Sequence, residues 1–133
     1  MKTFCKATMA IALFAGAASI WAQSTGTPPL KGVSASPLAA FEFERDTPDF
    51  VGRALRMRRI EIEPGGSIGE HSHRGRPAVL YVIQGEIVER RGEAQRSYAA
   101  GGSYAIGGDT AHAIENAGST PAVYIEVDIV PAR

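Results

Sequence analysis

The sequence predicts an all-β domain in which antiparallel strands form a sandwich or a barrel. Short apolar runs recur at regular intervals through most of the chain, and turn signals separate them. The chain has 15 glycines, and pairs such as Gly65-Gly66 and Gly101-Gly102 are typical of turns. The same stretch shows no helical period. About eight or nine short strands at this spacing are characteristic of sandwiches and barrels.

The N-terminus is interpreted as a secretory signal peptide over residues 1–22. Lys2 and Lys6 flank the start of a small, apolar run over 7–18, which is too short to span a bilayer. Ser19 to Ala22 then offers a cleavage site. A buried N-terminal helix and an uncleaved anchor are the alternatives. The sequence therefore predicts a periplasmic or secreted protein with no membrane attachment after cleavage.

Composition and charge divide the rest of the chain and narrow the classes of partner. The 133 residues fit one domain, and 14 Lys and Arg balance 14 Asp and Glu, so no nucleic-acid partner is expected. Cleavage would remove Cys5, the only cysteine, and leave no disulfide. Residues 23–36 hold few apolar side chains and are expected to form a flexible or extended arm before a domain over 37–133.

The first clear strand covers residues 51–63, and its apolar side chains change face part of the way along. The switch falls between Met57 and Ile60, which predicts a bulge or a turn at the two arginines between them. A basic run crosses this strand, and we expect its guanidinium groups on a solvated face, paired with glutamates of the same strand. One inward-pointing arginine that faces a substrate carboxylate is the alternative. The run consists of Arg53, Arg56, Arg58 and Arg59.

Further strands follow at short intervals. Residues 78–83 are all apolar, which predicts a strand buried on both faces. Residues 123–129 alternate between apolar and polar side chains, as in a strand with one buried face. The other expected strands are 68–73, 86–90 and 95–98 (a hairpin), 103–106 and 112–116.

Three histidines are the strongest functional signal. His71 and His73 are two residues apart, so from one strand both imidazoles point the same way. His112 lies on a later strand and would complete one face of a metal's coordination sphere if the fold brought it to the pair. Neutral imidazole is the commonest protein ligand for transition metals. The alternative is that the histidines are structural and bond the backbone inside a metal-free barrel.

The segments around these histidines resemble the two motifs of the cupin family. The first reads Gly65-x5-His71-x-His73-x4-Ala78-x6-Gly85, and the second reads Gly101-x5-Gly107-x-Asp109-x2-His112-x3-Asn116. Cupins are small antiparallel β-barrels, also described as jelly rolls or double-stranded β-helices. They often hold one metal through these histidines, usually joined by a glutamate. The resemblance spans about half of the chain and implies a single barrel of this type with His71, His73 and His112 as ligands.

The chain departs from the family motifs at three positions. Ala78 stands where the glutamate is usual, Gly107 where a proline is usual, and Asp109 where a glycine is usual. The missing glutamate leaves a three-histidine site. Asp109 lies in a loop, where it could serve as a substitute ligand, but bonding local backbone amides is the common role of Asp in a turn.

The expected cofactor is one divalent metal ion, namely Fe, Zn, Ni, Cu or Mn. Loss of a carboxylate should weaken binding of the oxygen-preferring Mn²⁺ most, and the other ions suit imidazole ligands better. Three neutral ligands also leave the full charge of the ion in place. That charge would lower the pKa of a bound water and attract anionic substrates.

Three side chains near the site are candidates for binding a substrate. Arg74 and Arg76 follow His73, and arginine can clamp a carboxylate with two parallel hydrogen bonds. Tyr104 could place a phenol in the cavity, whereas Tyr81 is expected to point outward. The alternatives are a solvated basic loop and an ordinary core tyrosine.

Together these features predict a small metalloenzyme that acts on a small, anionic organic molecule as a dioxygenase, an isomerase or a hydrolase. A non-catalytic module that binds a small molecule or metal and a metal-free structural barrel are the alternatives. Cupins are often dimeric through an edge strand or an exchanged arm. The resemblance therefore also implies a homodimer, in which Phe41 and Phe43 would suit the contact.

Overall fold

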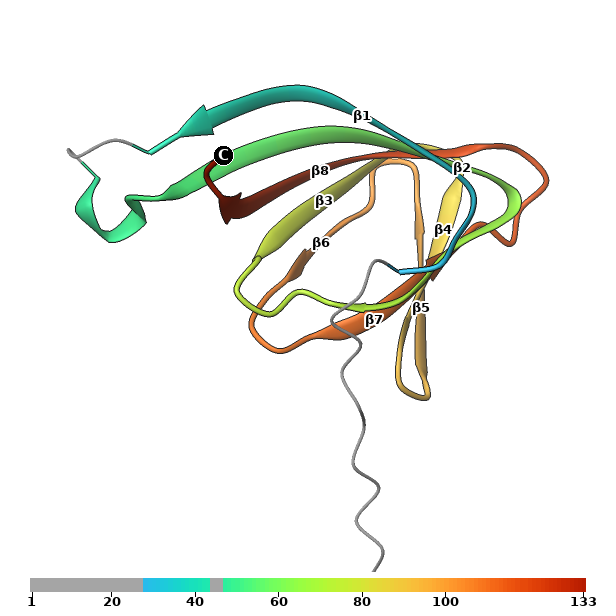
Figure 1. Cartoon of the computed structure of the whole chain (residues 1–133). Coiled ribbons are helices and arrows are strands. Elements are labelled where there is room, and N and C mark those ends of the chain that lie inside the picture. The colour runs from blue at the N-terminus through green and yellow to red at the C-terminus, as the bar shows by residue number, and fades with distance from the viewer. Residues whose placement is uncertain (1–27, 44–46) are drawn as a thin grey trace, which may run out of the picture.

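The computed structural model describes residues 28–43 and 47–133, so the expected signal peptide lies outside the described residues. The described chain is all-β, as predicted, and its order of elements is shown in Figure 1. The elements are β1 (Leu30–Glu42), a 3-10 turn η1 (Pro48–Phe50), β2 (Arg53–Ser72), β3 (Ala78–Gln84), β4 (Glu86–Arg91), β5 (Ala94–Ala99), β6 (Ser103–Ile106), β7 (Ala111–Glu115) and β8 (Ala122–Pro131).

The strands form one antiparallel sheet that curls into a nearly closed barrel (Figure 1). Their order is β5-β4-β7-β2-β8-β3-β6, and β1 pairs with β2 outside this path. The long strand β2 joins the two halves of the barrel, because residues 53–62 pair with β8 and residues 67–72 pair with β7. Within the described part of the chain, no helix is long and apolar enough to span a membrane.

The turn within β2 is held by the asparagine that ends the second motif. Asn116 is buried, and its side-chain amide donates to the backbone oxygens of Ile62 at 2.9 Å and Thr120 at 2.8 Å. Its backbone oxygen accepts from the amide of Gly65 at 2.9 Å. Gly65 has a φ of +70°, a conformation that favours glycine. These bonds give a structural role to the glycine that begins the first motif and to the asparagine that ends the second.

The interior of the barrel is apolar at one end and polar at the other. Along β8 the buried residues Ala122 and Tyr124 are followed by the buried carboxylates Glu126 and Asp128. The paired strand β2 matches this gradient, since its inner side chains change from isoleucine to arginine where β8 changes to carboxylates. The apolar core consists of Ile60, Ile62, Ile68, Leu80, Val82, Ile87, Ile114, Ala122 and Tyr124. The polar end therefore faces the site, while the apolar end supplies the packing.

The predicted bulge near Arg58-Arg59 is wrong for β2, which pairs with β8 in unbroken register from Arg53 to Ile62. A register shift opposite Arg58 lies instead in β1, between Pro37 and Ala39, and β1 has a second shift between Lys31 and Val33. The apparent change of face has another cause: Arg56 and Arg58 themselves occupy inward positions beside Ile60. Only Arg59 follows the expected pattern and pairs with Glu61 at 2.7 Å. The sequence predicts that the apolar face of each part of β2 points inward. In the structure, the buried carboxylates Glu126 and Asp128 on β8 hold Arg58 and Arg56 on the inner face.

The outer faces of β3 and β8 also differ from expectation. The run 78–83 was predicted to be buried on both faces, but Val79, Tyr81 and Ile83 are 46–55% exposed. Tyr81 points outward as predicted. On β8, the inward positions belong to Tyr124, Glu126 and Asp128 rather than to the alternating aliphatic residues. Apolar side chains therefore cover part of the outer surface of the sheet.

Within the arm expected over residues 23–36, Leu30 to Ser36 are extended and belong to β1. This strand pairs along the edge of β2 over most of its length. Of its side chains only that of Val33 is partly buried, so the strand is ordered by backbone hydrogen bonds rather than by burial. Low apolar content gave no signal for a strand of this kind. Residues 23–27 lie outside the described residues.

Candidate metal centre

The barrel brings the three histidines together at the polar end of its interior. His71 on β2 pairs directly with His112 on β7, and their ring centroids are 4.6 Å apart. His73 follows β2 at once, and its backbone amide donates to Thr110 at 2.9 Å, just before β7. One nitrogen from each ring lies within 4.8 Å of the others. The predicted trio is therefore a cluster that could bind a metal ion.

Close packing of the chain before β1 shapes the approach to His71. Gly69 lies under Pro29, and a Cβ atom at Gly69 would stand only 2.4 Å from the proline ring. The Gly69 amide donates to the Pro29 oxygen at 2.8 Å. The carbonyl of Gly69 meets Nδ1 of His71 at 2.9 Å. Position 69 therefore requires glycine, and the backbone oxygen of this glycine orients the ring of His71.

Each imidazole has its Nδ1 atom engaged by an acceptor. Nδ1 of His71 bonds the Gly69 oxygen, Nδ1 of His73 bonds the Arg76 oxygen at 3.0 Å, and Nδ1 of His112 bonds Glu89 Oε1 at 2.8 Å. A carbonyl or carboxylate oxygen only accepts, so every Nδ1 donates its proton. In the neutral rings, the lone pair is then on Nε2. Metal-ligating histidines are usually fixed in this way, by a bond from their other ring nitrogen.

The Nε2 atoms of His71 and His73 face each other without a proton between them. Nε2 of His73 and Nε2 of His71 are 3.2 Å apart. Two nitrogens bound to one zinc ion at 2.0–2.1 Å would be about 2.9–3.4 Å apart for ligand angles between octahedral and tetrahedral values. Nε2 of His112 is buried and has no hydrogen-bond partner among the described residues. The donor set therefore fits a cation held by three imidazoles.

Burial keeps the three rings neutral near pH 7. It is the main cause that lowers the pKa of His71, and it lowers the pKa of His73 to about 4 and that of His112 to about 3. Neighbouring charges and rings act in the same direction, with Arg76 acting on His73 and His71 acting on His112. Neutral imidazole is the form that binds metal, so no proton has to be displaced at physiological pH.

Glu89 is a site residue that sequence reasoning missed. It lies on β4, is 3% exposed, and bonds both Nδ1 of His112 and Nε of Arg91, each at 2.8 Å. A carboxylate behind a ligating histidine fixes its orientation and raises its basicity. The alternation along β4 could have revealed it, because Glu89 is two residues from the fully buried Ile87 and shares its face of the strand. An acidic residue on the apolar face of a strand is therefore expected to lie in the interior of the barrel.

Two further carboxylates lie beside the position where the family has its glutamate. Ala78 is buried, and on the next strand its direct partner is Asp128. Glu126 and Asp128 do not join the group of potential ligand atoms formed by the histidines. Their charges are instead balanced by arginines. The interior thus keeps acidic groups next to the missing glutamate, but they bind arginine side chains.

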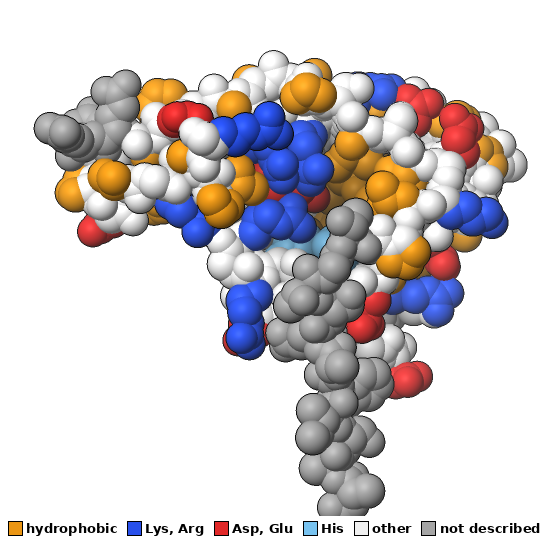
Figure 2. Space-filling view, viewed as in Figure 1, with side chains coloured by type: hydrophobic (Ala, Val, Ile, Leu, Met, Phe, Trp, Pro, Cys, Tyr) orange, Lys and Arg blue, Asp and Glu red, His pale blue; other side chains and the backbone are white. Residues whose placement is uncertain are grey.

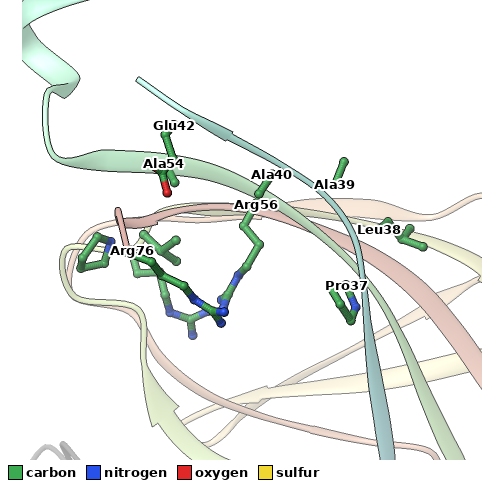
Figure 3. Close-up of a pocket in the computed structure, with 11 residues that line it drawn as sticks. Pro37, Leu38, Ala39, Ala40, Glu42, Ala54, Arg56 and Arg76 are labelled. Carbon is green, nitrogen blue, oxygen red and sulfur yellow. The ribbon is translucent and has the colours of Figure 1, made fainter. Parts of the chain in front are cut away.

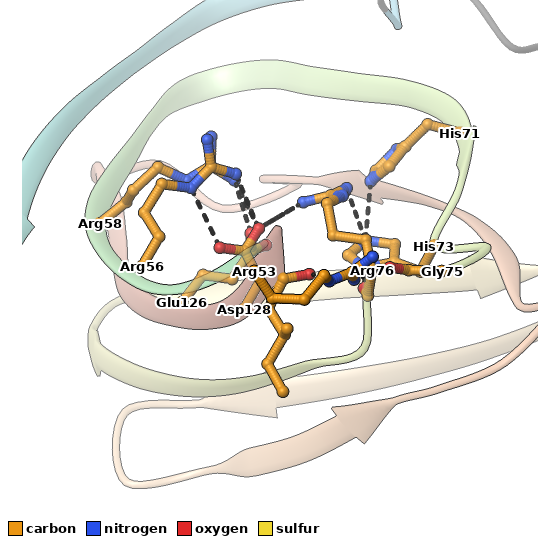
Figure 4. Close-up of polar contacts among 10 residues, drawn as sticks. Arg53, Arg56, Arg58, His71, His73, Gly75, Arg76, Glu126 and Asp128 are labelled. Atoms are coloured by element: carbon orange, nitrogen blue, oxygen red, sulfur yellow. Dashed lines mark hydrogen bonds and ion pairs between the residues drawn. The ribbon is translucent and has the colours of Figure 1, made fainter. Parts of the chain in front are cut away.

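The arginines around Glu126 and Asp128 form a continuous network (Figure 4). Arg56 binds Asp128 through two bonds, of 3.0 and 2.7 Å, and Arg58 binds Glu126 at 2.5 Å. Arg76 reaches Asp128 at 2.7 Å and Glu126 at 3.3 Å through Nη1, while its Nη2 atom is 3.3 Å from Nε2 of His73. Arg76 is therefore the link between the ionic network and the histidine cluster.

The other predicted site residues divide into two groups. Arg74 and Asp109 pair with each other at 2.9 Å on the surface, with side chains 66% and 71% exposed, and Asp109 lies outside the histidine cluster. Tyr104 is close to the cluster, since its ring centroid is 6.5 Å from that of His112. The Tyr104 ring stacks on Tyr98, and burial is the main cause that raises the pKa of its phenol. Its hydroxyl is buried without a partner in the described chain.

A pocket of about 690 Å³ opens beside the ionic network, between β1 and the end of β8. Arg56 and Arg76 reach into it from different elements, and their guanidinium groups lie side by side (Figure 3). Apolar side chains such as Leu38 and Val130 line another part of it. The space-filling view shows Lys and Arg side chains gathered next to the histidine surface (Figure 2). Among the residues that line the pocket, Arg76 is the one that also contacts the histidine cluster.

Comparison with known proteins agrees with this fold. Solved structures that resemble the chain include a predicted oxalate decarboxylase from Thermotoga maritima, with 23% identity, a TM-score of 0.52, and coverage of 71% of this chain and 92% of that chain. The polyketide cyclase RemF from Streptomyces resistomycificus has 18% identity and a TM-score of 0.61, with coverage of 77% and 68%. A domain of an XRE family transcriptional regulator from Enterobacter cloacae has 20% identity and a TM-score of 0.58, with coverage of 77% and 100%.

These likenesses show the fold alone, because the identities are low and the proteins differ in function. Comparison with curated proteins gave no match. The family model of the cupin domain, however, matches residues 58–128, which is more than half of the chain and includes all three histidines, Glu89 and every member of the ionic network except Arg56. The sequence motifs, the nearly closed antiparallel barrel and this match agree, and the chain belongs to the cupin domain family.

Proposed function

We propose that His71, His73 and His112 hold one divalent metal ion and that the chain is a small metalloenzyme acting on a small, anionic organic molecule. The observation that carries the metal site is the convergence of the three imidazole rings, each with one nitrogen within 4.8 Å of the others. The Nε2 atoms of His71 and His73 are 3.2 Å apart, and each ring donates from Nδ1 to an acceptor behind it. Lone pairs that face one another at this distance repel unless a cation lies between them.

The ligand set guides the choice of ion. Three imidazoles without a carboxylate favour Zn²⁺, Fe²⁺, Ni²⁺ or Cu²⁺ over Mn²⁺, which prefers oxygen ligands. Glu89 supports this set from behind, since it orients His112 rather than offering an oxygen to the cluster. We therefore keep Mn²⁺ as the least favoured of the five candidate ions.

Charge around the cluster supports an anionic substrate. When bound, a divalent ion in an open three-histidine site supplies Lewis-acid activation of a substrate oxygen or of water. Arg76 can orient an acidic group, because its guanidinium lies both at the pocket and at His73. The buried Tyr104 hydroxyl offers a further donor near His112. A dioxygenase, an isomerase and a hydrolase are all compatible with these groups.

Metal analysis tests this proposal directly. We would purify the protein without an affinity tag or chelator, measure its metals, and compare it with the double variant His71→Ala/His112→Ala. Near-stoichiometric metal in the wild type, absent from the variant, is expected. Protein that stays metal-free after reconstitution with each candidate ion would contradict the proposal and leave the metal-free barrel. Bound metal without turnover of any small carboxylate or other anionic substrate would instead favour a non-catalytic binding module.

Two proposals about the cellular form of the protein remain from the sequence. Export to the periplasm or the medium, with cleavage after Ala22, is tested by N-terminal sequencing of the purified protein.

A homodimer is supported by Phe41, which is 58% exposed although its ring contacts Phe43 edge-on at 5.5 Å. Sedimentation of the wild type and Phe41→Ser tests it. A monomeric wild type would contradict the dimer.

A further inference from the structure

Arg76 faces two environments at once. It lies in the segment between β2 and β3, and its side chain is 25% exposed and lines the pocket beside β1. On the inner side its Nη2 atom is 3.3 Å from Nε2 of His73. Its Nη1 atom binds Asp128 and Glu126. A single guanidinium therefore connects the pocket, the buried carboxylates and the histidine cluster.

The ionic network has one cation in excess. Arg56, Arg58 and Arg76 face two carboxylates, Glu126 and Asp128, so the formal charge of the group is +1. At the pocket rim, the side chains of Arg133 and Glu42 carry one charge of each sign. The three arginine side chains of the network are 25–28% exposed, so an ion from solvent can reach them. An anion in the pocket would supply the missing partner.

The lining of the pocket indicates the chemical class of that anion. Arg56 and Arg76 present neighbouring guanidinium groups, and such groups bind carboxylates through parallel hydrogen bonds (Figure 3). Next to them the wall is apolar and includes Pro37, Leu38 and Val130. A charged head beside an apolar wall suits a small carboxylate that carries an aliphatic substituent.

The inner bond of Arg76 competes with metal binding. Nδ1 of His73 donates to the Arg76 backbone oxygen, so Nε2 carries the only lone pair of the ring. The Arg76 guanidinium and a metal ion would both use this lone pair, and both are cations. A ligand that draws Nη2 of Arg76 toward the pocket would free His73 for the metal.

We propose that the pocket binds a small aliphatic carboxylate between Arg56 and Arg76, and that this draws Arg76 away from His73 and strengthens metal binding. The inference rests on the proposed function of the histidine cluster and adds to it a carboxylate subsite and a coupling residue. Coupling between two ligands is reciprocal. The metal must therefore strengthen carboxylate binding by the same factor. Either ligand can bind first, and the complex with both ligands is favoured.

Calorimetric titration with Zn²⁺ tests the coupling. Metal-free protein would be titrated at rising concentrations of butyrate, with butyramide as the uncharged control of similar shape. We expect butyrate, but not butyramide, to raise the Zn²⁺ affinity of the wild type by about tenfold, within the usual range of coupling between sites. Arg76→Ala should bind Zn²⁺ more tightly than the wild type without butyrate and should no longer respond to butyrate.

The matched control is Arg59→Ala, because Arg59 lies on the same barrel but pairs with Glu61 on the outer face. It should respond to butyrate like the wild type. If Arg76→Ala does not fold, Arg76→Gln takes its place, since it removes the charge but keeps a polar side chain beside Asp128. Equal Zn²⁺ affinities of the wild type with and without butyrate would overturn the inference. A full butyrate response in the Arg76 variant would overturn it as well.

Failure of the metal site and failure of the coupling can be told apart. A wild type that binds no Zn²⁺ under any condition would contradict the proposed function, and the coupling with it. The carboxylate subsite would still be tested by saturation-transfer NMR of butyrate with metal-free protein. Signal in the wild type that is lost in Arg76→Ala and Arg56→Ala supports the subsite, and equal signals in all three overturn it.

Discussion

His71 on β2 and His112 on β7 are direct partners across two antiparallel strands, although 41 positions separate them in the sequence. The paired backbone sets their ring centroids 4.6 Å apart. A shift of one residue in the register would turn one ring to the opposite face of the sheet. The site is therefore a property of strand pairing, which the long strand β2 and the core behind it maintain.

Glu89→Gln should weaken metal binding without removing it. The amide would keep a hydrogen bond to Nδ1 of His112 but would no longer place a negative charge behind the ring. Loss of such a supporting carboxylate commonly lowers metal affinity by about 10–100-fold. Competitive titration with a metal-responsive dye measures the change. Glu115→Gln is the control, because Glu115 pairs with Arg90 away from the cluster, and an equal loss in both variants would contradict the role of Glu89.

Ala78→Glu should change the preference of the site among metals. The new carboxylate would stand at the position where the family has its glutamate, beside Asp128 on the neighbouring strand. Because Mn²⁺ prefers oxygen ligands, we expect its affinity to rise by about tenfold or more, while that of Zn²⁺ changes less. Electron paramagnetic resonance of free Mn²⁺ during titration measures this. A folded variant with unchanged Mn²⁺ affinity would show that position 78 does not face the cluster.

Asp128 should make stability depend on pH in the acid range. Burial opposes ionisation of Asp128, but hydrogen bonds from Arg56 and Arg76 outweigh it and lower the pKa of this carboxyl below its usual value. A lowered pKa in the folded state means that the stabilisation is fully present above the pKa of the unfolded chain, which is about 3.9. It is lost as the pH falls below that value.

Urea unfolding of the wild type and Asp128→Asn at several pH values measures this contribution. At pH 7 the variant leaves arginines without their buried partner, and we expect a loss toward the lower end of about 3–5 kcal/mol, since these arginines are partly exposed. The difference should shrink below about pH 4. Asp109→Asn breaks an exposed pair and should cost only about 0–1 kcal/mol. A difference that is constant from pH 7 to pH 3 would contradict the assignment.

Packing at the apolar end of the barrel should dominate its stability. Ile62 is fully buried, and Ile62→Ala should lower the free energy of unfolding by about 2–5 kcal/mol. Ile83 has the same side chain but is 46% exposed on the outer face of β3, so Ile83→Ala should change stability by about 0.5 kcal/mol or less. Chemical denaturation compares the two. Similar losses would mean that the outer face is covered in solution.

Much of the barrel could be predicted from the sequence because each strand there combines local patterning with glycine turns. The spacing of His71, His73 and His112 also predicted the cluster, since residues two apart share a face and the motif resemblance supplied the third ligand. β1 could not be predicted in the same way, because backbone pairing orders it and its side chains bury little. The local pattern of apolar and polar residues therefore does not predict such a strand.

The polar interior was missed for a related reason. Glu89, Glu126 and Asp128 lie inside because their partners come from distant strands, namely His112 and the arginines of β2. The sequence of a single strand such as β8 shows only alternation, which predicts that the more apolar face points inward. Which parity faces inward depends on charge matching across the barrel. That information resides in the register between strands rather than in any one of them.

The most direct test of the account is the coordination of the bound metal. X-ray absorption at the metal edge of protein reconstituted with Zn²⁺ would count the imidazole ligands and measure their distances. We predict three imidazole nitrogens at about 2.0–2.1 Å, with one of them lost in His112→Ala. A spectrum with no imidazole nitrogen, or with the same nitrogen count in His112→Ala, would contradict the three-histidine centre.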